Sequence, residues 1–368
     1  MASNIFRELP AESGIFRDES VLRPEFMPDE LPGREREMRE MALCLQEAAR
    51  GRAPPSMLLT GPPGVGKTST AKMVLKQLQE VSRKALPVYI NCWESSTRFG
   101  ILNALVLALG DMMPRRGIAT DEIIMRLAEI GRRQEMIPIV VLDEMDRLLA
   151  SGTHEEQILY DLSRAHEALG IKASMIGITN DEEVTIRLDA RVRSSLTNHA
   201  ILFKPYGPAE LKDILKARAA RAFAPHSLDD EVIGVCAAVG AKAGGDARLA
   251  IHSLWAAGKK AEQEGARRVG VSHVKAAQAY AIEQGATPAV RKSGGLDLLD
   301  KKIIEMIMGS AGMDSGAIYA KLGMDEPNEQ RNIRNRLSVL EKGGLIDGEE
   351  RAKPDGGHTR RWKIRRTD

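Results

Sequence analysis

Nine consecutive residues, GPPGVGKTS at 61–69, have the composition and spacing of a loop that binds phosphate groups. Its glycines let backbone amides approach phosphate oxygens, and the following helix directs the positive end of its dipole toward them. Lys67 is long enough to reach the β and γ phosphates of a nucleotide, and the Thr68 hydroxyl is a suitable Mg²⁺ ligand. We therefore predict that the phosphates are bound by Gly61, Gly64, Val65, Gly66, Lys67, Thr68 and Ser69.

Two carboxylates follow a run of apolar residues in the segment VVLDEMD. Asp143 and Glu144 stand where a buried strand ends, and ligands of parallel α/β sheets bind at the carboxyl ends of strands. Asp143 is placed to hold Mg²⁺ through water, and Glu144 is placed to orient or polarise an attacking water. Such a pair alone is often only a solvated strand end, but the phosphate loop in the same chain favours a catalytic pair.

Asn180 and Arg248 are two further polar candidates. Asn180 ends the segment ITND, where it either positions the same water or simply forms a turn. Arg248 lies in the first turn of a helix predicted to begin at Gly245 and Asp246. A cation is unfavourable at a helix N-terminus, which indicates an anionic partner such as a γ-phosphate.

Two more arginines, Arg191 and Arg193, lie in the segment LDARVRSSL at 188–196. We find no helix cap, no regular apolar period and no metal-ligand pattern in it. Two surface arginines in a loop are an ordinary alternative to a functional role, since charged side chains are usually solvated.

These residues need a framework that brings strand ends together. Continuous apolar runs predict buried strands, and apolar residues at helical spacing predict helices between them. Strands alternating with helices favour an α/β fold with a parallel sheet. The predicted strands lie at 56–60, 87–91, 137–144, 172–180 and 200–206.

The pattern along the chain predicts three domains. Residues 1–206 form the nucleotide-binding α/β domain, with an extended N-terminal arm at 1–33. The strands stop after Pro205, and alanine-rich helical spacing predicts a helical domain at 207–285. A linker at 286–295 leads to the last domain at 296–368.

The last domain has the features of a domain that binds double-stranded DNA. In the predicted helix NEQRNIRNRLSVLEKGGLI, apolar residues share one arc, and polar and positively charged residues share the opposite arc. Such a face suits docking in a major groove. A strand hairpin follows around 354–357, with Trp362 and Ile364 pointing inward. Seven Lys or Arg against two Asp at 351–368 make the segment basic, so phosphate contacts would supply most of the affinity. The candidate DNA contacts are Arg331, Arg334, Asn335, Ser338, Lys342, Arg360, Arg361 and Lys363.

The bulk composition limits the class of protein. The 368 residues suffice for two or three domains, and 43% hydrophobic with 28% charged residues describes a globular chain. The net charge is only +2, so any basic surface must be local. Three widely spaced cysteines indicate reduced thiols rather than a metal site. We see no signal peptide and no apolar run long enough to span a bilayer, which predicts a cytoplasmic protein without a membrane partner.

Taken together, these segments resemble the AAA+ ATPases. GPPGVGKT resembles the Walker A motif, IVVLDEMD resembles Walker B, and Asn180 and Arg248 resemble sensors 1 and 2. More narrowly, the chain resembles archaeal replication initiators related to the origin recognition complex and the cell-division-cycle-six loader. Four stretches carry this likeness: IFRDESVLRPEFMPDELPGREREM, LDARVRSSL, FKPYGPAELKDILKARA and GGDARLAIHSLWAA.

The resemblance implies further roles for particular residues. The N-terminal arm would cradle the nucleotide, and Tyr206 and Arg218 would line it. Arg191 matches the arginine finger that faces the ATP of a neighbouring subunit, with Arg193 as the alternative. The segment at 91–117 resembles a helical insert that touches DNA, where Arg115 and Arg116 are the candidate cations, although a core helix with a solvated loop explains it equally well.

The resemblance also implies a function. It is that of an initiator of AAA+ fold, with a helical lid and a C-terminal winged helix, that uses slow, Mg²⁺-dependent hydrolysis of ATP to ADP as a switch on double-stranded origin DNA. The implied partners are other initiator subunits and the replicative helicase, at the nucleoid. The alternative is a DNA motor or loader of the branch-migration or clamp-loader type. A clamp loader lacks a winged helix, which the last domain argues against. The branch-migration motor has a winged helix, but its N-terminal pattern finds no match here.

Overall fold

The computed structural model of the chain divides into two compact units, Met1–Lys275 and Ala276–Asp368. It describes residues 14–112, 114, 119–133, 135–150, 153–181, 183–283, 298–308, 312–322, 330, 333–334, 336–337, 340–341, 346–352 and 358–364.

A parallel sheet of five strands forms the centre of the first unit, in the order β2-β3-β4-β1-β5. The strands are β1 (Met57–Thr60), β2 (Ala85–Asn91), β3 (Ile137–Asp143), β4 (Ser174–Ile178) and β5 (Ala200–Leu202). This confirms the parallel α/β prediction. Every residue of β3 is buried, as expected for an interior strand covered on both faces.

The register of the sheet brings the predicted strand ends together. β3 pairs with β4, and β4 pairs with β1, which leads directly into the phosphate loop. Asn91 at the end of β2 lies opposite Asp143 at the end of β3. One edge of the sheet therefore presents the polar residues that follow β1, β2, β3 and β4.

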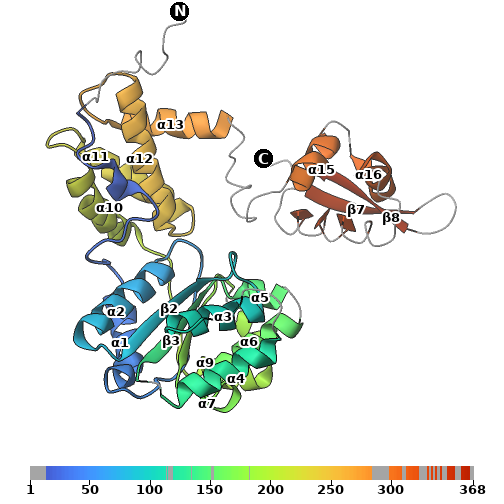
Figure 1. Cartoon of the computed structure of the whole chain (residues 1–368). Helices are drawn as coiled ribbons and strands as arrows, with labels where there is room; N and C mark the ends of the chain where they lie inside the picture. The colour runs from blue at the N-terminus through green and yellow to red at the C-terminus, as the bar shows by residue number, and fades with distance from the viewer. Residues whose placement is uncertain are drawn as a thin grey trace, which may run out of the picture. The chain divides into compact units, whose positions relative to one another are not determined.

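Helices cover both faces of this sheet (Figure 1). Helices α1 (Glu35–Ala49) and α2 (Lys67–Val81) pack on one face against alternate strand residues such as Leu59 and Val141. Residues of opposite parity, such as Leu58 and Val140, face the other layer. That layer contains α3 (Arg98–Ala108), α4 (Thr120–Gly131), α5 (Asp146–Ala150), α6 (Thr153–Ser163), α7 (Ala165–Ala168), α8 (Val184–Arg187) and α9 (Ala190–Thr197).

The segment LDARVRSSL is helical, so our finding of neither a cap nor an apolar period was wrong. Asp189 caps α9, because its side chain accepts a hydrogen bond from the Arg191 amide. Val192 and Leu196, four residues apart, are buried against the layer beneath. The helical spacing was present in the sequence, but only two apolar residues, Val192 and Leu196, carried it.

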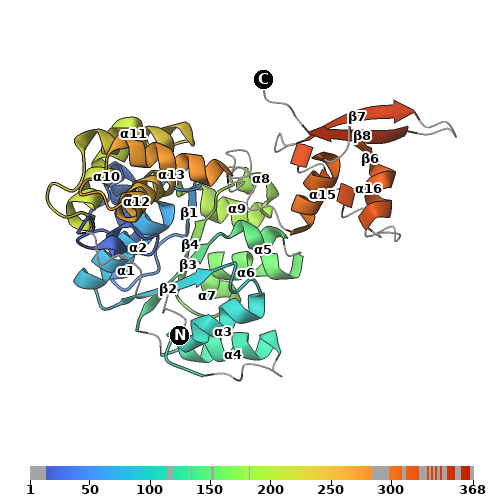
Figure 2. The same cartoon turned by 90° about the horizontal axis from the view of Figure 1, so that it is seen from above.

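Four helices form the lid: α10 (Pro208–Ala222), α11 (Asp230–Lys242), α12 (Ala247–Gln263) and α13 (Val271–Glu283), whose first residues belong to the first unit. The N-terminal arm is built into the lid core, with Ile15 and Leu22 buried among lid side chains. Its short 3-10 helix η2 (Glu19–Leu22) lies against α10 and α12 (Figure 2).

The second unit has a three-stranded antiparallel sheet in the order β6-β8-β7. Within the described residues it contains α15 (Leu298–Met308), β6 (Met313–Asp314), α16 (Ser315–Leu322), β7 (Ile346–Ala352) and β8 (His358–Ile364). Trp362 is buried in the core beside Leu337 and Leu340, and its Nε1 donates to Ser315 Oγ at 2.9 Å. The antiparallel pairing of β7 with β8 supplies the two strands of the predicted hairpin, whose turn at 354–357 lies outside the described residues. Ile333, Leu337 and Leu340 of the predicted apolar arc are buried.

The predicted domain boundaries do not coincide with the boundary between the two compact units. The boundary between 206 and 207 falls inside the first unit, and the linker predicted at 286–295 lies outside the described residues. The three-domain division stays a prediction. Among the described residues, none of the helices has the length and apolar character needed to cross a membrane.

Candidate nucleotide site

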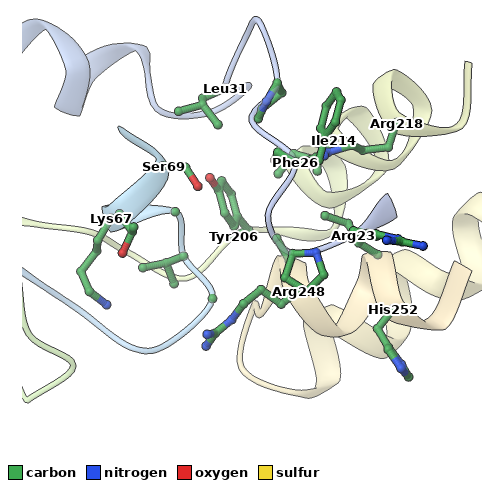
Figure 3. A pocket seen from close by; sticks show the side chains of 18 of the residues that line it. Arg23, Phe26, Leu31, Lys67, Ser69, Tyr206, Ile214, Arg218, Arg248 and His252 are labelled. Carbon is green, nitrogen blue, oxygen red and sulfur yellow. Dashed lines mark hydrogen bonds between the residues drawn. The ribbon is translucent and has the colours of Figure 1, made fainter. Parts of the chain in front are cut away.

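A cavity of about 1050 Å³ opens between the edge of the sheet and the lid. Its walls come from the arm, the phosphate loop, the ends of β2, β3 and β4, and helices α10 and α12. Figure 3 shows the lining side chains of the arm, the phosphate loop and the two helices. Of the predicted phosphate-loop residues, all but Gly61 line the cavity, namely Gly64, Val65, Gly66, Lys67, Thr68 and Ser69.

The glycines of the loop are needed because the loop is crowded and left-handed. Gly64 has a φ of +77° and lies against the Asp246 carboxylate, so a side chain would clash there. Gly66 has a φ of +89°, and a β-carbon would lie 2.7 Å from the Tyr206 hydroxyl. Gly61 does not line the cavity, and its carbonyl accepts a hydrogen bond from Lys67 Nζ at 2.6 Å.

Lys67 is the cation of the phosphate loop and is almost fully buried. Its Nζ donates to the carbonyls of Gly61 and Pro62 and, at 2.8 Å, to Oδ1 of Asn180. Burial lowers the pKa of Lys67 to about 8, the Glu144 carboxylate counteracts this, and the Arg248 guanidinium adds to it. An anion placed here would restore the charged form.

Asp143 and Thr68, the two residues predicted to bind Mg²⁺, lie in direct contact. The Thr68 hydroxyl donates to Asp143 Oδ2 at 2.9 Å. The Tyr89 hydroxyl donates to the same oxygen, and burial together with this bond raises the pKa of Tyr89. The Asp143 carboxylate is therefore held from two sides at the cavity wall.

Glu144 and Asn180 form the second polar pair. Asn180 Nδ2 donates to Glu144 Oε2 at 2.7 Å, while the Asn180 oxygen accepts from Lys67. Burial raises the pKa of Glu144, and the bond from Asn180 opposes that rise. Glu144 has a φ of +57°, an unfavourable conformation for a residue with a side chain, and such strain gathers at functional sites.

Arg248 reaches from the N-terminal end of α12 toward the side of the cavity where Lys67 lies (Figure 3). Its side chain is 61% exposed, and its Nε lies 3.6 Å from Oδ1 of Asp246, the residue that caps the helix. The unfavourable cation at a helix N-terminus thus has a local carboxylate partner, and its guanidinium remains accessible to a phosphate.

Tyr206 and Arg218, implied by the resemblance, both line the cavity. Tyr206 is 4% exposed, and burial raises its pKa to about 12. Arg218 binds the arm, donating to the carbonyls of Val21 at 2.7 Å and Phe26 at 3.3 Å. Burial, then the neighbouring Arg221, lowers the pKa of Arg218 to about 10.

Comparisons with known proteins show the family to which the chain belongs. The model of the AAA domain matches residues 50–182, and that of the Cdc6 AAA+ ATPase-type lid domain matches residues 212–279. The ORC1-type DNA replication protein of Thermococcus kodakarensis is 36% identical over 98% of this chain and 91% of its own length. The chain belongs to the ORC1-type DNA replication proteins. It is therefore an AAA+ ATPase of the replication-initiator family, which binds nucleotide.

Solved structures agree with that family. The Aeropyrum pernix ORC1 protein, solved in complex with DNA, is 34% identical with a TM-score of 0.79 and covers 96% of this chain and 94% of its own. The Thermotoga maritima RuvB branch-migration motor has a TM-score of 0.51 at 20% identity, covering 94% and 96%. At that identity the motor shares the fold alone.

The candidate finger residues of this ORC1-type protein lie outside the cavity. Arg191 is 65% exposed, its Nε lies 3.2 Å from Asp189 Oδ1, and its guanidinium carbon lies 4.8 Å from the centre of the Tyr160 ring. Arg193 is exposed on the same helix. Neither side chain lines its own chain's nucleotide site.

The candidate DNA contacts of this ORC1-type protein are described only in part. Arg334 and Arg360 are exposed, while Arg361 and Lys363 are half-buried. Lys363 pairs with Glu349 at 2.9 Å, and Arg360 pairs with Glu341 at 3.1 Å. The remaining candidates lie outside the described residues: Arg115, Arg116, Arg331, Asn335, Ser338 and Lys342.

Sequence reasoning missed two residues that shape this site. Tyr89 lies in the edge strand β2, and nothing in its sequence neighbours indicates that its hydroxyl reaches Asp143. Arg34 precedes α1 and reads as part of a solvated helix start, yet it is only 3% exposed. A cation just before a helix, where a capping residue is expected, was the available signal for Arg34.

Proposed function

We propose that this protein is an ATP-switched initiator that binds origin duplex DNA and changes state when the nucleotide is hydrolysed. The observation that carries the proposal is the convergence of Lys67, Asn180 and Glu144 at one cavity wall, joined by hydrogen bonds and faced by Arg248 of the lid. A site of this kind binds a nucleoside triphosphate across two parts of the fold, so the bound state of the nucleotide acts on the lid.

Thr68 and Asp143 are the residues that would hold Mg²⁺. They form an oxygen-only pair 2.9 Å apart at the cavity wall, and oxygen ligands are those that this ion prefers. The ion, when bound, neutralises charge on the β and γ phosphates. Tyr89 keeps the Asp143 carboxylate oriented through its hydrogen bond.

Glu144 is placed to accept a proton from the attacking water. As the water oxygen bonds to the γ-phosphorus, the bond to the β,γ-bridging oxygen breaks, and ADP leaves with the electron pair. The raised pKa of Glu144 suits this role, because a base acts best when its pKa approaches the working pH. Asn180 fixes the carboxylate, and Lys67 compensates charge on the phosphates.

Hydrolysis by an isolated chain should be slow. Arg191 and Arg193 lie outside the cavity, so neither side chain acts on the nucleotide of its own chain. We infer that Arg191, exposed on α9, is the arginine finger and that assembly with the same or a paralogous initiator speeds hydrolysis.

DNA binding is proposed for the winged helix and for the AAA+ insert with Arg115 and Arg116. Arg334 on the helix and Arg360, Arg361 and Lys363 on β8 supply the cations, and duplex affinity rests largely on such contacts to phosphates. The Aeropyrum pernix relative was solved in complex with DNA.

The deciding experiment compares duplexes at fixed salt. Footprinting on the organism's own origin region, with ATP and with ADP, should reveal protected repeats, and a scrambled duplex of the same length is the control. Equal affinity for repeat and scrambled duplex would remove the initiator proposal. DNA-stimulated processive turnover would favour a motor.

We also infer that the DNA-bound protein recruits the replicative helicase. Capture of the purified helicase on origin DNA, with ATP and with ADP in parallel, tests this separately. Origin binding without capture in either state would restrict the protein to marking or regulating the origin.

A further inference from the structure

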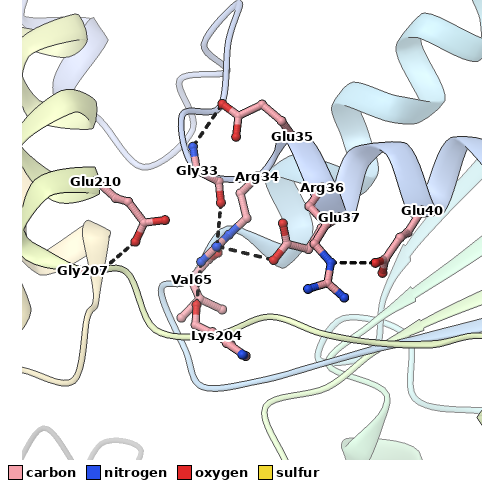
Figure 4. A network of polar contacts seen from close by, with 10 residues as sticks. All are labelled: Gly33, Arg34, Glu35, Arg36, Glu37, Glu40, Val65, Lys204, Gly207 and Glu210. Atoms are coloured by element: carbon pink, nitrogen blue, oxygen red, sulfur yellow. Dashed lines mark hydrogen bonds and ion pairs between the residues drawn. The ribbon is translucent and has the colours of Figure 1, made fainter.

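Arg34 directly follows the arm, precedes α1 and lies behind the phosphate loop, outside the residues that line the cavity. It is 3% exposed, and its guanidinium donates to three carbonyls (Figure 4). Nε binds the carbonyl of Val65 at 2.8 Å, Nη2 binds that of Lys204 at 2.7 Å, and Nη1 binds that of Gly33 at 2.8 Å. Three separate segments of the chain therefore meet at one side chain.

The position of this guanidinium is fixed from several sides. Its carbon lies 3.8 Å from the centre of the Tyr206 ring, and Nη1 lies 3.7 Å from Oε1 of Glu37. A buried guanidinium is tolerated only where hydrogen bonds and an opposite charge replace water. Both conditions are met here, so Arg34 is a rigid donor in a fork geometry that lysine does not have.

Four carbonyls of the phosphate loop accept hydrogen bonds from side chains or from the lid, those of Gly61 and Pro62 from Lys67 on the cavity side. The Ala247 amide of the lid binds the Gly64 carbonyl at 3.1 Å, and Arg34 binds that of Val65. In a trans peptide the carbonyl and the next amide point in opposite directions. Holding the Val65 carbonyl therefore sets the direction of the Gly66 amide.

We propose that Arg34 is a positioning residue that aims the Gly66 amide at the phosphates of the bound nucleotide. The Val65 carbonyl points to Arg34 behind the loop, so the Gly66 amide points to the opposite, cavity side. Backbone amides bind phosphate well when they are oriented before the ligand arrives.

The same contact ties the loop to the lid. Lys204 lies between β5 and the lid, two residues before Tyr206. The arm that leads directly to Arg34 is anchored in the lid core at Ile15 and Leu22. Arg34 therefore links the loop to the lid both through the chain of the arm and through the segment leading to α10.

The test compares Arg34→Lys with Arg36→Lys in the full-length protein. Arg36 lies two residues further along, is 81% exposed and pairs with Glu40 at 2.8 Å. Lysine at position 34 keeps the charge but reaches only one of the carbonyls, so ADP should dissociate about tenfold faster, a change typical of one well-placed hydrogen bond. Arg36→Lys should leave the rate unchanged.

A spectroscopic readout separates positioning from general loosening. The sequence contains three Val–Gly pairs, so carbonyl-¹³C-valine with ¹⁵N-glycine labelling selects the amides of Gly66, Gly240 and Gly270. If its amide binds phosphate, Gly66 should be the one whose signal shifts strongly on ADP binding. In Arg34→Lys this shift should be reduced, while the Gly240 and Gly270 signals keep their wild-type positions.

Three results would overturn the proposal. The first is unchanged ADP dissociation in Arg34→Lys, and the second is faster dissociation with a wild-type Gly66 shift. The third is loss of the fold, measured as an early thermal transition or as displacement of all three glycine signals, because a purely structural residue would behave in this way.

Discussion

Asn180 donates a hydrogen bond of 2.7 Å from Nδ2 to Oε2 of Glu144. The other end of the same amide accepts from Lys67. One neutral side chain therefore separates the phosphate-binding cation from the carboxylate that would activate water, and it holds both without forming a direct ion pair between them.

Removing this amide should slow the chemistry more than it weakens binding. In Asn180→Ala we expect ATP turnover to fall by about ten- to a hundredfold, since the carboxylate is no longer fixed, while ADP affinity changes little. Asn198→Ala, an exposed asparagine just after α9, is the matched control. Phosphate release and ADP titration measure the two effects, and equal losses in both would contradict the assignment.

Glu144→Gln should abolish most of the hydrolysis while keeping the nucleotide. The amide has nearly the same shape and can still accept from Asn180, but it cannot take a proton from water. Turnover should fall by about a hundredfold or more, the range for loss of a general base. ATP affinity measured by calorimetry should stay close to that of the wild type. Unchanged turnover would show that another group accepts the proton.

The affinity for ADP should depend on pH above neutrality. The pKa of Lys67 is lowered to about 8 by burial, and bound phosphate favours its charged form. Affinity should therefore be constant below about pH 8 and fall as pH rises above that value, with proton uptake on binding near pH 8. Lys67→Arg, which stays charged, should lose this dependence. Calorimetry in two buffers with different ionisation enthalpies measures the proton uptake.

Arg191→Ala and Arg193→Ala should differ in their effect on assembled protein. If Arg191 acts across a subunit interface, its removal should lower turnover only at concentrations where the wild type gains activity by assembling. Both side chains are exposed, so stability should hardly change in either variant. Hydrolysis measured over a dilution series tests this. The proposal fails if both variants keep wild-type turnover in the assembled state.

In the winged helix, Arg334→Ala should relax sequence preference, whereas Lys363→Ala should weaken all duplexes alike and reduce the salt slope by about one. Glu349 holds Lys363 at 2.9 Å, so Glu349→Gln should release this cation and strengthen binding to any duplex. Affinities for origin and scrambled duplex across a salt series give these values. The reverse pattern for Arg334 and Lys363 would exchange their assignments.

Short motifs and apolar periods predicted the framework because they depend on neighbours in sequence. The phosphate loop, the acidic pair after β3 and the tip of β4 were placed correctly at one edge of the sheet. The role of Arg34 could not be predicted, since its three acceptors lie up to 170 residues away in the sequence. Helix α9 was not predicted either, because its eight residues bury only two side chains, which is too few to show a helical apolar period.

The contacts of the arm also determine when the lid core can form during synthesis of the chain. The Ile15 carbonyl accepts from the Ser227 hydroxyl across 212 residues, and Ile15, Val21 and Leu22 complete the lid core. A ribosome makes these apolar residues first and their partners much later, so the lid folds only after the sheet domain between them has been made. Deletion of residues 1–24 should therefore unfold the lid, because the lid core loses Ile15, Val21 and Leu22, while the sheet domain should stay folded.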